Sequence, residues 1–239
     1  FMCTYEIAGM LQKKKYFAFK KLSALFAALP IIFVFMLPSK YNLLPTALFV
    51  IICWLQLLMN NDKPEILKKV SVSLGVNLMG LMPIFFLSQI YCYNESNILT
   101  GAKLLIYMVI VTKSGDTFAY VTGMLSNKIL KGKNHKIVPS ISPKKSWEGT
   151  IGGLFFSILA SYCLYYYLFN ETSYFIPMIA GAFLFIGGFF GDLAESSFKR
   201  NCGVKDSGRI LPGMGGACDL VDSFIFNAPL FYFYILLFV

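Results

Sequence analysis

Two pairs of carboxylates lie in the C-terminal part of the sequence, at the ends of two apolar segments. Asp192 and Glu195 end one apolar run, and Asp219 and Asp222 open the next. Residues with this i,i+3 spacing lie on one face of a helix, with Cβ atoms about 5–6 Å apart. Two such pairs at one depth repel each other unless cations lie between them, and oxygen ligands without His or Cys suit a hard cation. The spacing therefore predicts a site for an ion such as Mg²⁺, which commonly bridges carboxylates and phosphates.

Cations and glycines fill the segment between these two pairs. Positive side chains neutralise phosphate oxygens, and glycines let a backbone approach a ligand closely. The cations are Lys199, Arg200, Lys205 and Arg209, and the glycines are Gly213, Gly215 and Gly216. A solvated, positively charged loop at a membrane surface would explain the cations, but it would not explain acids at the ends of both flanking segments.

A second polar segment, residues 135–153, runs into another apolar stretch. Its Ser142-Pro start, followed by Glu148, resembles a helix N-terminus, and helix N-termini attract anions. Lys144 and Lys145 could hold a triphosphate as point charges. The alternative is a juxtamembrane cluster that binds lipid headgroups. The only histidine, His135, is interpreted as a surface residue rather than a catalytic base.

One apolar segment, Ala102–Leu125, contains Lys113 and Asp116 near its middle. A charge at the centre of a bilayer costs at least about 2.5–3.5 kcal/mol, so such residues normally face an interior cavity and serve function. A structural ion pair at i,i+3 spacing is the alternative. On these residues alone, phosphoryl or nucleotidyl transfer to or from a lipid is favoured, and a transporter of phosphorylated solutes is the rival.

Apolar helices must position these side chains. Of the 239 residues, 57% are hydrophobic and 14% are charged, whereas a soluble domain is about 25% charged. A span needs about 20 apolar residues. We therefore predict an all-α, polytopic transmembrane helical bundle of about seven spans, forming a single membrane domain over residues 1–239, with N-terminal spans in 22–101 and a catalytic portion in 102–239. The expected spans are Leu22–Pro38, Leu43–Met59, Val70–Tyr91, Ala102–Leu125, Gly149–Phe169, Tyr174–Gly191 and Ser223–Val239.

The distribution of charge predicts an orientation. The net charge is +9, and lysine-rich connections alternate with lysine-poor ones, which is the pattern of the positive-inside rule. Seven spans with a cytosolic N-terminus reproduce the alternation and put residues 126–148 and Gly191–Asp222 on the cytosolic side. Nucleic acid is not expected as a partner, because no basic face carries exposed aromatic residues. The six cysteines are scattered, so neither a disulfide framework nor a zinc site is predicted.

At these polar residues the sequence resembles the phosphatidate cytidylyltransferases, also called CDP-diacylglycerol synthases. Their signature has the form S-x-x-K-R-x-x-x-x-K-D-x-G, then P-x-H-G-G-x-x-D-R-x-D. The matching residues here are Ser196, Lys199, Arg200, Lys205, Asp206, Gly208, Pro212, Gly215, Gly216, Asp219 and Asp222. Upstream, a D-x-x-A-Y-x-x-G block is met by Asp116, Ala119, Tyr120 and Gly123. Ser142–Gly149 matches another block, and the resemblance runs from about Leu99 to the end.

The sequence departs from the family pattern at two positions. Met214 stands where the family has His, and Leu220 stands where it has Arg. Methionine cannot donate a hydrogen bond, and leucine cannot pair with a phosphate. A catalytically impaired family member is therefore one alternative. Family members also usually begin with an extra apolar hairpin that ends near W-E-x-x-x-L. Tyr5–Leu11 is similar to that stretch, so the chain is expected to lack the hairpin.

The resemblance implies transfer of the cytidylyl group of CTP to phosphatidic acid, giving CDP-diacylglycerol and pyrophosphate in phospholipid biosynthesis. A CTP-dependent lipid or polyprenol kinase is the alternative activity. Mg²⁺ is the implied cofactor, and a second, monovalent cation such as K⁺ is allowed. The implied location is the bacterial inner membrane or an organelle membrane, with the active site on the cytosolic side. The implied partners are CTP, phosphatidic acid and membrane lipid, and a homodimer is left open.

The resemblance also implies residue roles. The implied metal ligands are Asp192, Asp219 and Asp222. The implied catalytic residues are Asp192, Asp219, Lys199, Arg200 and Lys205. The implied substrate-binding residues are Asp116, Ser142, Lys144, Lys145, Ser196, Gly215 and Gly216.

Overall fold

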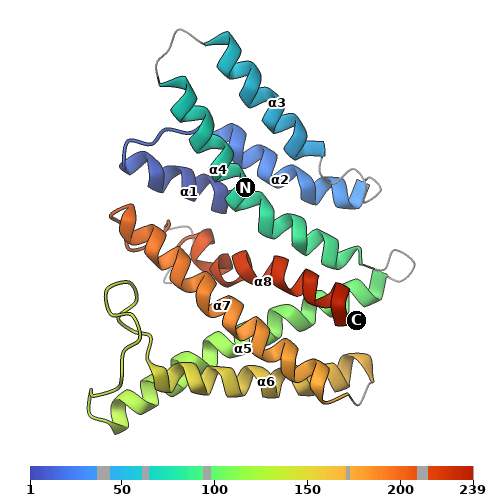
Figure 1. Cartoon of the computed structure of the whole chain (residues 1–239), viewed down its shortest axis with the longest axis vertical. Coiled ribbons are helices and arrows are strands. Elements are labelled where there is room, and N and C mark those ends of the chain that lie inside the picture. The colour runs from blue at the N-terminus through green and yellow to red at the C-terminus, as the bar shows by residue number, and fades with distance from the viewer. Residues whose placement is uncertain (37–43, 61–64, 94–97, 171–172, 209–214, 239) are drawn as a thin grey trace. The chain divides into compact units, whose positions relative to one another are not determined.

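A computed structural model describes residues 1–36, 44–60, 65–93, 98–170, 173–208 and 215–238 (Figure 1). Within these ranges the secondary structure is helical, apart from an isolated bridge between Lys136 and Ser146. The described helices are α1 (Met2–Lys13), α2 (Lys20–Met36), α3 (Leu44–Met59), α4 (Ile66–Tyr91), α5 (Ile98–Ile129), α6 (Trp147–Phe169), α7 (Phe175–Asn201) and α8 (Ala217–Phe238).

The all-helical prediction is confirmed for the described residues, and each predicted span overlaps one helix. The helices α4 to α8 are long and apolar enough to cross a membrane. The apolar helix α3 has 16 residues and α2 has 17, so seven spans and their orientation stay predictions. The helix α1 was not predicted, because its 12 residues mix polar and apolar side chains and are too few for a span.

The chain divides into two compact units. Unit 1 comprises Phe1–Cys92 and Phe198–Asp222, and unit 2 comprises Tyr93–Ser197 and Ser223–Val239. Of the predicted residues, Asp219 and Lys199 belong to unit 1, whereas Asp116 and Asp192 belong to unit 2. The predicted single membrane domain stays a prediction.

Unit 1 has two apolar clusters. In one, Ile7 and Met10 of α1 pack with Val76 of α4 and with the buried thiols Cys202 and Cys218. Burial raises the pKa of the Cys202 thiol, an effect that the nearby Lys14 ammonium partly offsets. This cluster fixes α1 against the segment that carries the second half of the family signature.

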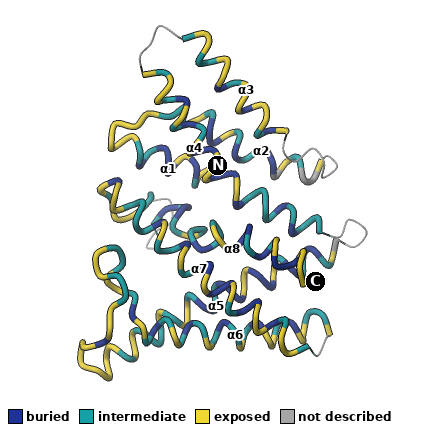
Figure 2. The backbone as a smooth tube through the Cα atoms, viewed as in Figure 1, coloured by how far each residue is buried: buried dark blue, intermediate teal, exposed yellow. Residues whose placement is uncertain are grey.

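The second cluster of unit 1 joins Phe49 and Cys53 of α3 to Val70 of α4. The opposite side of α3 keeps large apolar side chains exposed, including Trp54 at 60% and Leu58 at 72% (Figure 2). A contiguous apolar surface of this kind is unusual on a soluble protein and suits contact with lipid.

In unit 2, α5 and α6 lie side by side (Figure 1). A Cβ added at Gly153 of α6 would lie 2.6 Å from Ala119 Cβ and 2.8 Å from the Gly115 carbonyl oxygen of α5. A Cβ at Gly152 would likewise lie 2.4 Å from Thr122 Oγ1. These glycines therefore let α5 and α6 pack closely, as expected where apolar helices associate through small residues.

We expect Gly153→Ala to lower the free energy of unfolding by about 1–3 kcal/mol, because a methyl group cannot enter this contact without moving a backbone. The matched control is Gly75→Ala in α4, where an added Cβ meets no atom within 4 Å. The control should leave stability unchanged or raise it by at most about 1 kcal/mol. Thermal unfolding of both variants in detergent measures the difference. Equal stability of the two variants would contradict the packing account.

A buried amide ties three helices of unit 2 together. Asn227 of α8 is fully buried, and its Nδ2 donates to Thr112 Oγ1 of α5 at 2.8 Å and to the Leu184 carbonyl of α7 at 2.9 Å. Polar links between apolar helices fix their register. The sequence analysis did not single out Asn227.

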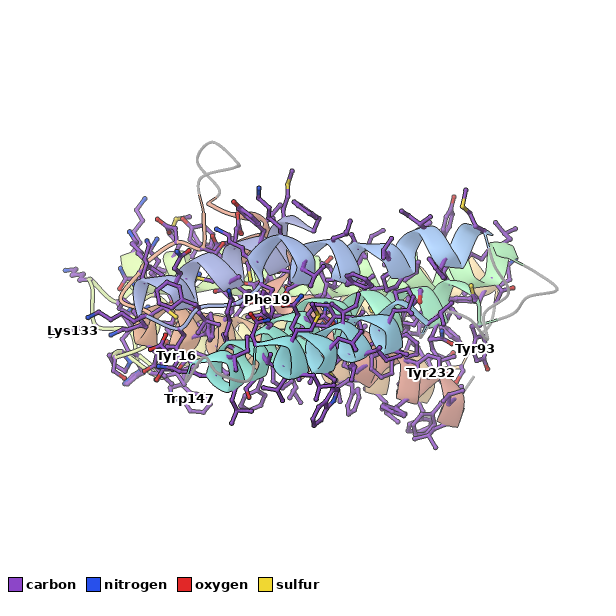
Figure 3. All side chains as sticks on the ribbon, turned by 90° about the horizontal axis from the view of Figure 1, so that it is seen from above. Tyr16, Phe19, Tyr93, Lys133, Trp147 and Tyr232 are labelled. Atoms are coloured by element: carbon purple, nitrogen blue, oxygen red, sulfur yellow. The ribbon has the colours of Figure 1, made fainter. Side chains whose placement is uncertain are left out.

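Aromatic side chains lie at both ends of unit 2 (Figure 3). Figure 3 shows Lys133 and Trp147 at one end of this unit, and Tyr93 and Tyr232 at the other. Tyr and Trp are enriched at both membrane–water interfaces. The arrangement is therefore the one expected of a bundle that crosses a bilayer between the two sets.

Candidate active site

The loop before α6 is ordered by its own backbone. Trp147 N–H donates to the His135 carbonyl at 2.9 Å, and Ile137 N–H donates to the Lys145 carbonyl at 3.2 Å. Ser146 caps α6, since its hydroxyl oxygen accepts the Gly149 N–H at 3.2 Å. These contacts hold the lysines of the loop next to the start of a helix.

The prediction that the Ser142-Pro motif begins the helix was wrong. Ser142 lies in the preceding turn, and α6 begins at Trp147, because Ser146 supplies the extended backbone and the side-chain oxygen that a cap requires. The interpretation of His135 as a surface residue is confirmed. Its side chain is 79% exposed, and Nδ1 lies 2.8 Å from Glu148 Oε1.

A cavity of about 220 Å³ in unit 2 brings five predicted residues together. It is lined by Asp116 of α5, by Ser142, Lys144 and Lys145 of the loop, and by Asp192 of α7. The site therefore combines two carboxylates, two lysines and a hydroxyl with a helix N-terminus, which is a donor set suited to phosphate groups.

Lys145 is held at the wall of this cavity by α7. Its Nζ lies 3.3 Å from Asp192 Oδ2 and donates to the Phe189 carbonyl at 3.1 Å. The ammonium also lies 4.4 Å from the centre of the Phe189 ring. The side chains of Lys145 and Asp192 are only 20% and 26% exposed. The two charges therefore compensate each other, and Lys145 has a fixed direction.

Asp116 of α5 lines the cavity and also contacts Lys113 of α5 and Ser223 of α8. Lys113 Nζ lies 3.3 Å from Asp116 Oδ2 and donates to Ser223 Oγ at 2.9 Å, and Ser223 Oγ in turn lies 3.2 Å from Asp116 Oδ2. The i,i+3 ion pair considered from the sequence is thus present. Because Asp116 also lines the cavity, the pair connects this wall of the cavity to α8.

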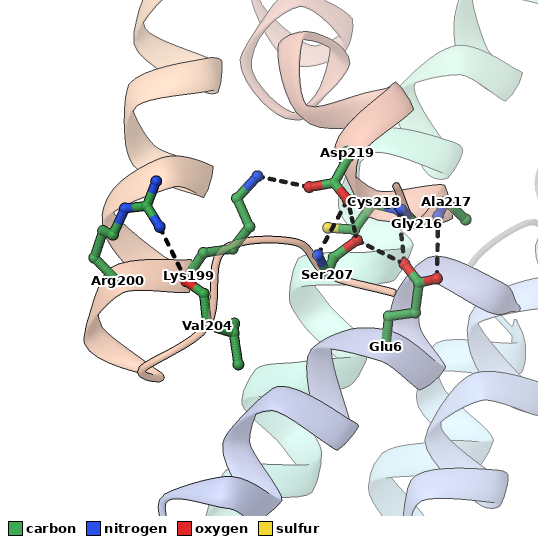
Figure 4. Close-up of polar contacts among 9 residues, drawn as sticks. All are labelled: Glu6, Lys199, Arg200, Val204, Ser207, Gly216, Ala217, Cys218 and Asp219. Atoms are coloured by element: carbon green, nitrogen blue, oxygen red, sulfur yellow. Dashed lines mark hydrogen bonds and ion pairs between the residues drawn. The ribbon is translucent and has the colours of Figure 1, made fainter. Parts of the chain in front are cut away.

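In unit 1, Asp219 stands in the first turn of α8 and accepts hydrogen bonds on both oxygens (Figure 4). Lys199 Nζ donates to Oδ1 at 2.6 Å. Oδ2 accepts Gly216 N–H at 2.7 Å, Ser207 Oγ–H at 2.9 Å and Ser207 N–H at 3.1 Å. The side chains of Lys199 and Asp219 are each 12% exposed. This carboxylate therefore joins Lys199 and Ser207 to Gly216 at the start of α8.

Gly215 and Gly216 shape this turn. Gly215 has a φ of +97°, which other residues rarely adopt, and a Cβ there would lie 2.5 Å from Asp219 Oδ2. Gly216 is buried and contributes its N–H to the same oxygen. These two glycines bring the backbone close to Asp219, and their predicted approach to a substrate stays a prediction.

The remaining predicted residues differ in how far they are exposed. Arg200, Lys205 and Asp206 are exposed, and Arg200 Nη1 donates to the Val204 carbonyl at 3.4 Å. Glu195 is buried, whereas Ser196 and Asp222 are partly buried. Leu220, one of the two departures from the family pattern, is 42% exposed. The candidates Arg209, Pro212, Gly213 and Met214 lie outside the described residues.

Sequence reasoning assigned no role to Ser207 or to Glu6, although Glu6 lies in the Tyr5–Leu11 stretch that resembles W-E-x-x-x-L. Ser207 Oγ lies 2.9 Å from both Glu6 Oε2 and Asp219 Oδ2, and its single hydroxyl hydrogen can be donated to either of them. Glu6 is 7% exposed on a helix whose neighbours Ile7 and Ala8 are buried. An acid at a buried position of an otherwise apolar helix face is the signal that could have identified it, because such a group needs partners.

The donor chemistry of the predicted metal ligands fits a hard cation. Asp192 and Asp219 offer only oxygen atoms as ligands. A lysine ammonium lies 3.3 Å from Asp192 and another lies 2.6 Å from Asp219. Each carboxylate therefore already stabilises a positive charge. Within the described part of either unit, however, no three His, Cys, Asp or Glu side chains gather in the way that a metal site requires.

Comparison with known proteins adds a second line of evidence to this geometry. The sequence pattern of the cytidylyltransferase family matches residues 1–238. The chain belongs to this family. The recognition made from the polar motifs is thus confirmed, and it extends to the helices before Leu99.

Among the curated relatives, some are named phosphatidate cytidylyltransferases and one is named an uncharacterized protein. The phosphatidate cytidylyltransferase of Staphylococcus haemolyticus (strain JCSC1435) is 39% identical over 150 residues, which are 63% of this chain and 55% of the relative. That of Staphylococcus aureus (strain COL) is 42% identical over 130 residues, which are 54% and 48%. The uncharacterized protein YnbB of Escherichia coli (strain K12) is 33% identical over 192 residues, which are 80% and 62%. The chain thus spans between 48% and 62% of the length of these relatives.

Proposed function

We propose that this protein is a nucleotidyltransferase that moves the cytidylyl group of CTP to phosphatidic acid, giving CDP-diacylglycerol and pyrophosphate. The observation that carries the proposal is the cavity of unit 2, which collects Asp116, Ser142, Lys144, Lys145 and Asp192 from separate parts of the sequence. The family match and the names of the staphylococcal relatives support the same reaction.

The lysines carry the electrostatic part of the proposal. Lys144 and Lys145 hold the phosphates of the nucleotide at the start of α6, and the fixed direction of Lys145 removes the cost of orienting it during the reaction. Lys199, Arg200 and Lys205 add positive charge in the first half of the signature. Asp116 and Ser142 line the cavity and shape the substrate site. Ser196, Gly215 and Gly216 stay substrate-binding residues by family resemblance.

The reaction needs positioning more than acid–base chemistry. A phosphate oxygen of the lipid attacks the α-phosphorus of CTP, the bond from that phosphorus to the bridging oxygen breaks, and pyrophosphate leaves. A phosphate monoester is already anionic at neutral pH, so no strong general base is required. The exposed position of His135, the only histidine, agrees with this scheme.

Asp192, Asp219 and Asp222 are the proposed ligands of Mg²⁺. The ion would neutralise charge on the reacting phosphate and on the departing pyrophosphate. A second, monovalent cation such as K⁺ stays an implication of the family resemblance. The protein is proposed to be a multi-pass membrane protein of about seven spans, with its N-terminus and its site on the cytosolic side. Five described helices are long enough to cross a membrane.

A transfer assay tests the proposal. Purified protein receives Mg²⁺, phosphatidic acid in mixed micelles and CTP labelled in the cytosine ring. We expect label to enter the lipid phase only when phosphatidic acid is present. Diacylglycerol replaces phosphatidic acid in the control, since it lacks the attacking phosphate. Failure of cytosine label to reach the lipid, together with transfer of a γ-phosphate label, would instead identify a lipid kinase.

A further inference from the structure

The carboxylate of Glu6 caps a helix that is remote in sequence (Figure 4). Glu6 lies on α1, yet Oε1 accepts the Ala217 N–H at 3.1 Å and Oε2 accepts the Cys218 N–H at 2.9 Å. Ala217 and Cys218 are the first residues of α8. The first N–H groups of a helix have no partner within the helix, and its N-terminus carries partial positive charge. Glu6 supplies acceptors for two of these N–H groups and adds its negative charge to that of Asp219 in the first turn of α8.

Two glycines lie against this carboxylate. A Cβ at Gly208 would lie 2.2 Å from Glu6 Oε1, and a Cβ at Gly216 would lie 2.5 Å from Oε2. Glycine at both positions therefore allows the acid to enter the turn. Glu6 itself is 7% exposed, so its charge depends on these hydrogen bonds for compensation.

Glu6 and Asp219 hold the same short segment from two sides. Ser207 Oγ lies 2.9 Å from Glu6 Oε2 and 2.9 Å from Asp219 Oδ2. Gly216 N–H donates to Asp219, and the next two N–H groups along the chain donate to Glu6. Any shift of Glu6 therefore changes the position of the backbone from which Asp219 extends.

We propose that Glu6 is a positioning residue, which fixes the first turn of α8 and thereby the direction of the Asp219 carboxylate. Glu6 acts through Gly216, Ala217, Cys218 and Ser207 and does not itself contact substrate. The catalytic consequence rests on the proposed function, whereas the contact with α8 does not.

The variant Glu6→Gln tests this role, because a glutamine keeps the shape but can accept with only one of its two terminal atoms. The matched control is Glu65→Gln, which removes an acid from the same unit where no side-chain cap is present. We expect kcat to fall about 10-fold to 100-fold for Glu6→Gln, as for other supporting residues. The KM for CTP should change little, and the control should behave as the wild type.

Hydrogen exchange provides a readout that does not depend on activity. In Glu6→Gln, amide exchange should accelerate in the peptide that contains residues 215–219 and stay unchanged in peptides from the rest of unit 1. Ser207→Ala should accelerate the same peptide, and the effects of the two substitutions on kcat should not multiply, because both act on one segment. Multiplying effects would show independent roles and overturn the proposal.

Two further outcomes would also overturn it. Exchange that accelerates throughout unit 1 would show a general role in folding, and exchange equal to that of Glu65→Gln would show that the cap has no effect. If the wild-type protein transfers no cytidylyl group, the proposed function fails, while the exchange data still decide the role of Glu6.

Discussion

Replacing Asp219 by Asn is expected to lower cytidylyl transfer by at least about 100-fold to 1,000-fold, the range seen when one preorganised electrostatic group is removed. Four donors converge on this carboxylate, from Lys199, Ser207 and Gly216. The amide of an asparagine cannot accept from all of them, and its NH₂ would face another donor. The initial rate with saturating CTP and phosphatidic acid measures the effect.

The same substitution leaves a mostly buried lysine without its carboxylate, so the free energy of unfolding should also fall, by about 1–3 kcal/mol. The double variant Lys199→Met with Asp219→Asn removes both charges and separates the two effects. It should recover most of the stability and none of the activity. Wild-type turnover in Asp219→Asn would remove Asp219 from the mechanism, and recovery of activity in the double variant would show that only stability had been lost.

Replacing Lys145 by Met is expected to lower kcat/KM for CTP about 100-fold to 1,000-fold. The side chain lines the cavity and is directed by Asp192 and by the Phe189 carbonyl. Methionine keeps the apolar stem but removes the ammonium that would meet the nucleotide phosphates. Steady-state kinetics over a range of CTP concentrations measures the loss.

Lys133→Met is the matched control for this prediction. Lys133 is an exposed lysine of the same loop and does not line the cavity. Its removal should change kcat/KM by less than about 3-fold, since exposed charges interact weakly with distant groups. Similar losses in the two variants would mean that the loop acts through its general positive charge rather than through a defined phosphate contact.

The sequence predicted most helices because long apolar runs are a strong signal. It missed α1, whose 12 residues include Glu6 among apolar neighbours. It expected the span to begin near Gly149 but interpreted the Ser142-Pro motif as the helix N-terminus, because Ser-Pro and Ser146 both match the residue preferences of a helix start. Only the structure distinguishes these two candidate starts: Ser146 has an extended backbone, and its side chain accepts a hydrogen bond from the Gly149 N–H.

The sequence predicted which residues belong to the candidate site, but not which of them contact one another. Fixed spacing shows which residues share one helix face, so the Lys113–Asp116 pair was foreseeable. Spacing cannot show that Lys145 faces Asp192, or that Glu6 meets Ala217 across 211 positions of sequence. Such pairings arise from the packing of different helices, which no local pattern determines.

Cytidylyl transfer, rather than phosphoryl transfer, is the reaction proposed for the cavity of unit 2. Its most direct test is the identity of the water-soluble product released per molecule of lipid modified. The proposed reaction predicts one pyrophosphate for each cytidine found in lipid, with the ratio unchanged while Lys145→Met lowers the rate of both. Release of CDP with a phosphate gained by the lipid would contradict the account.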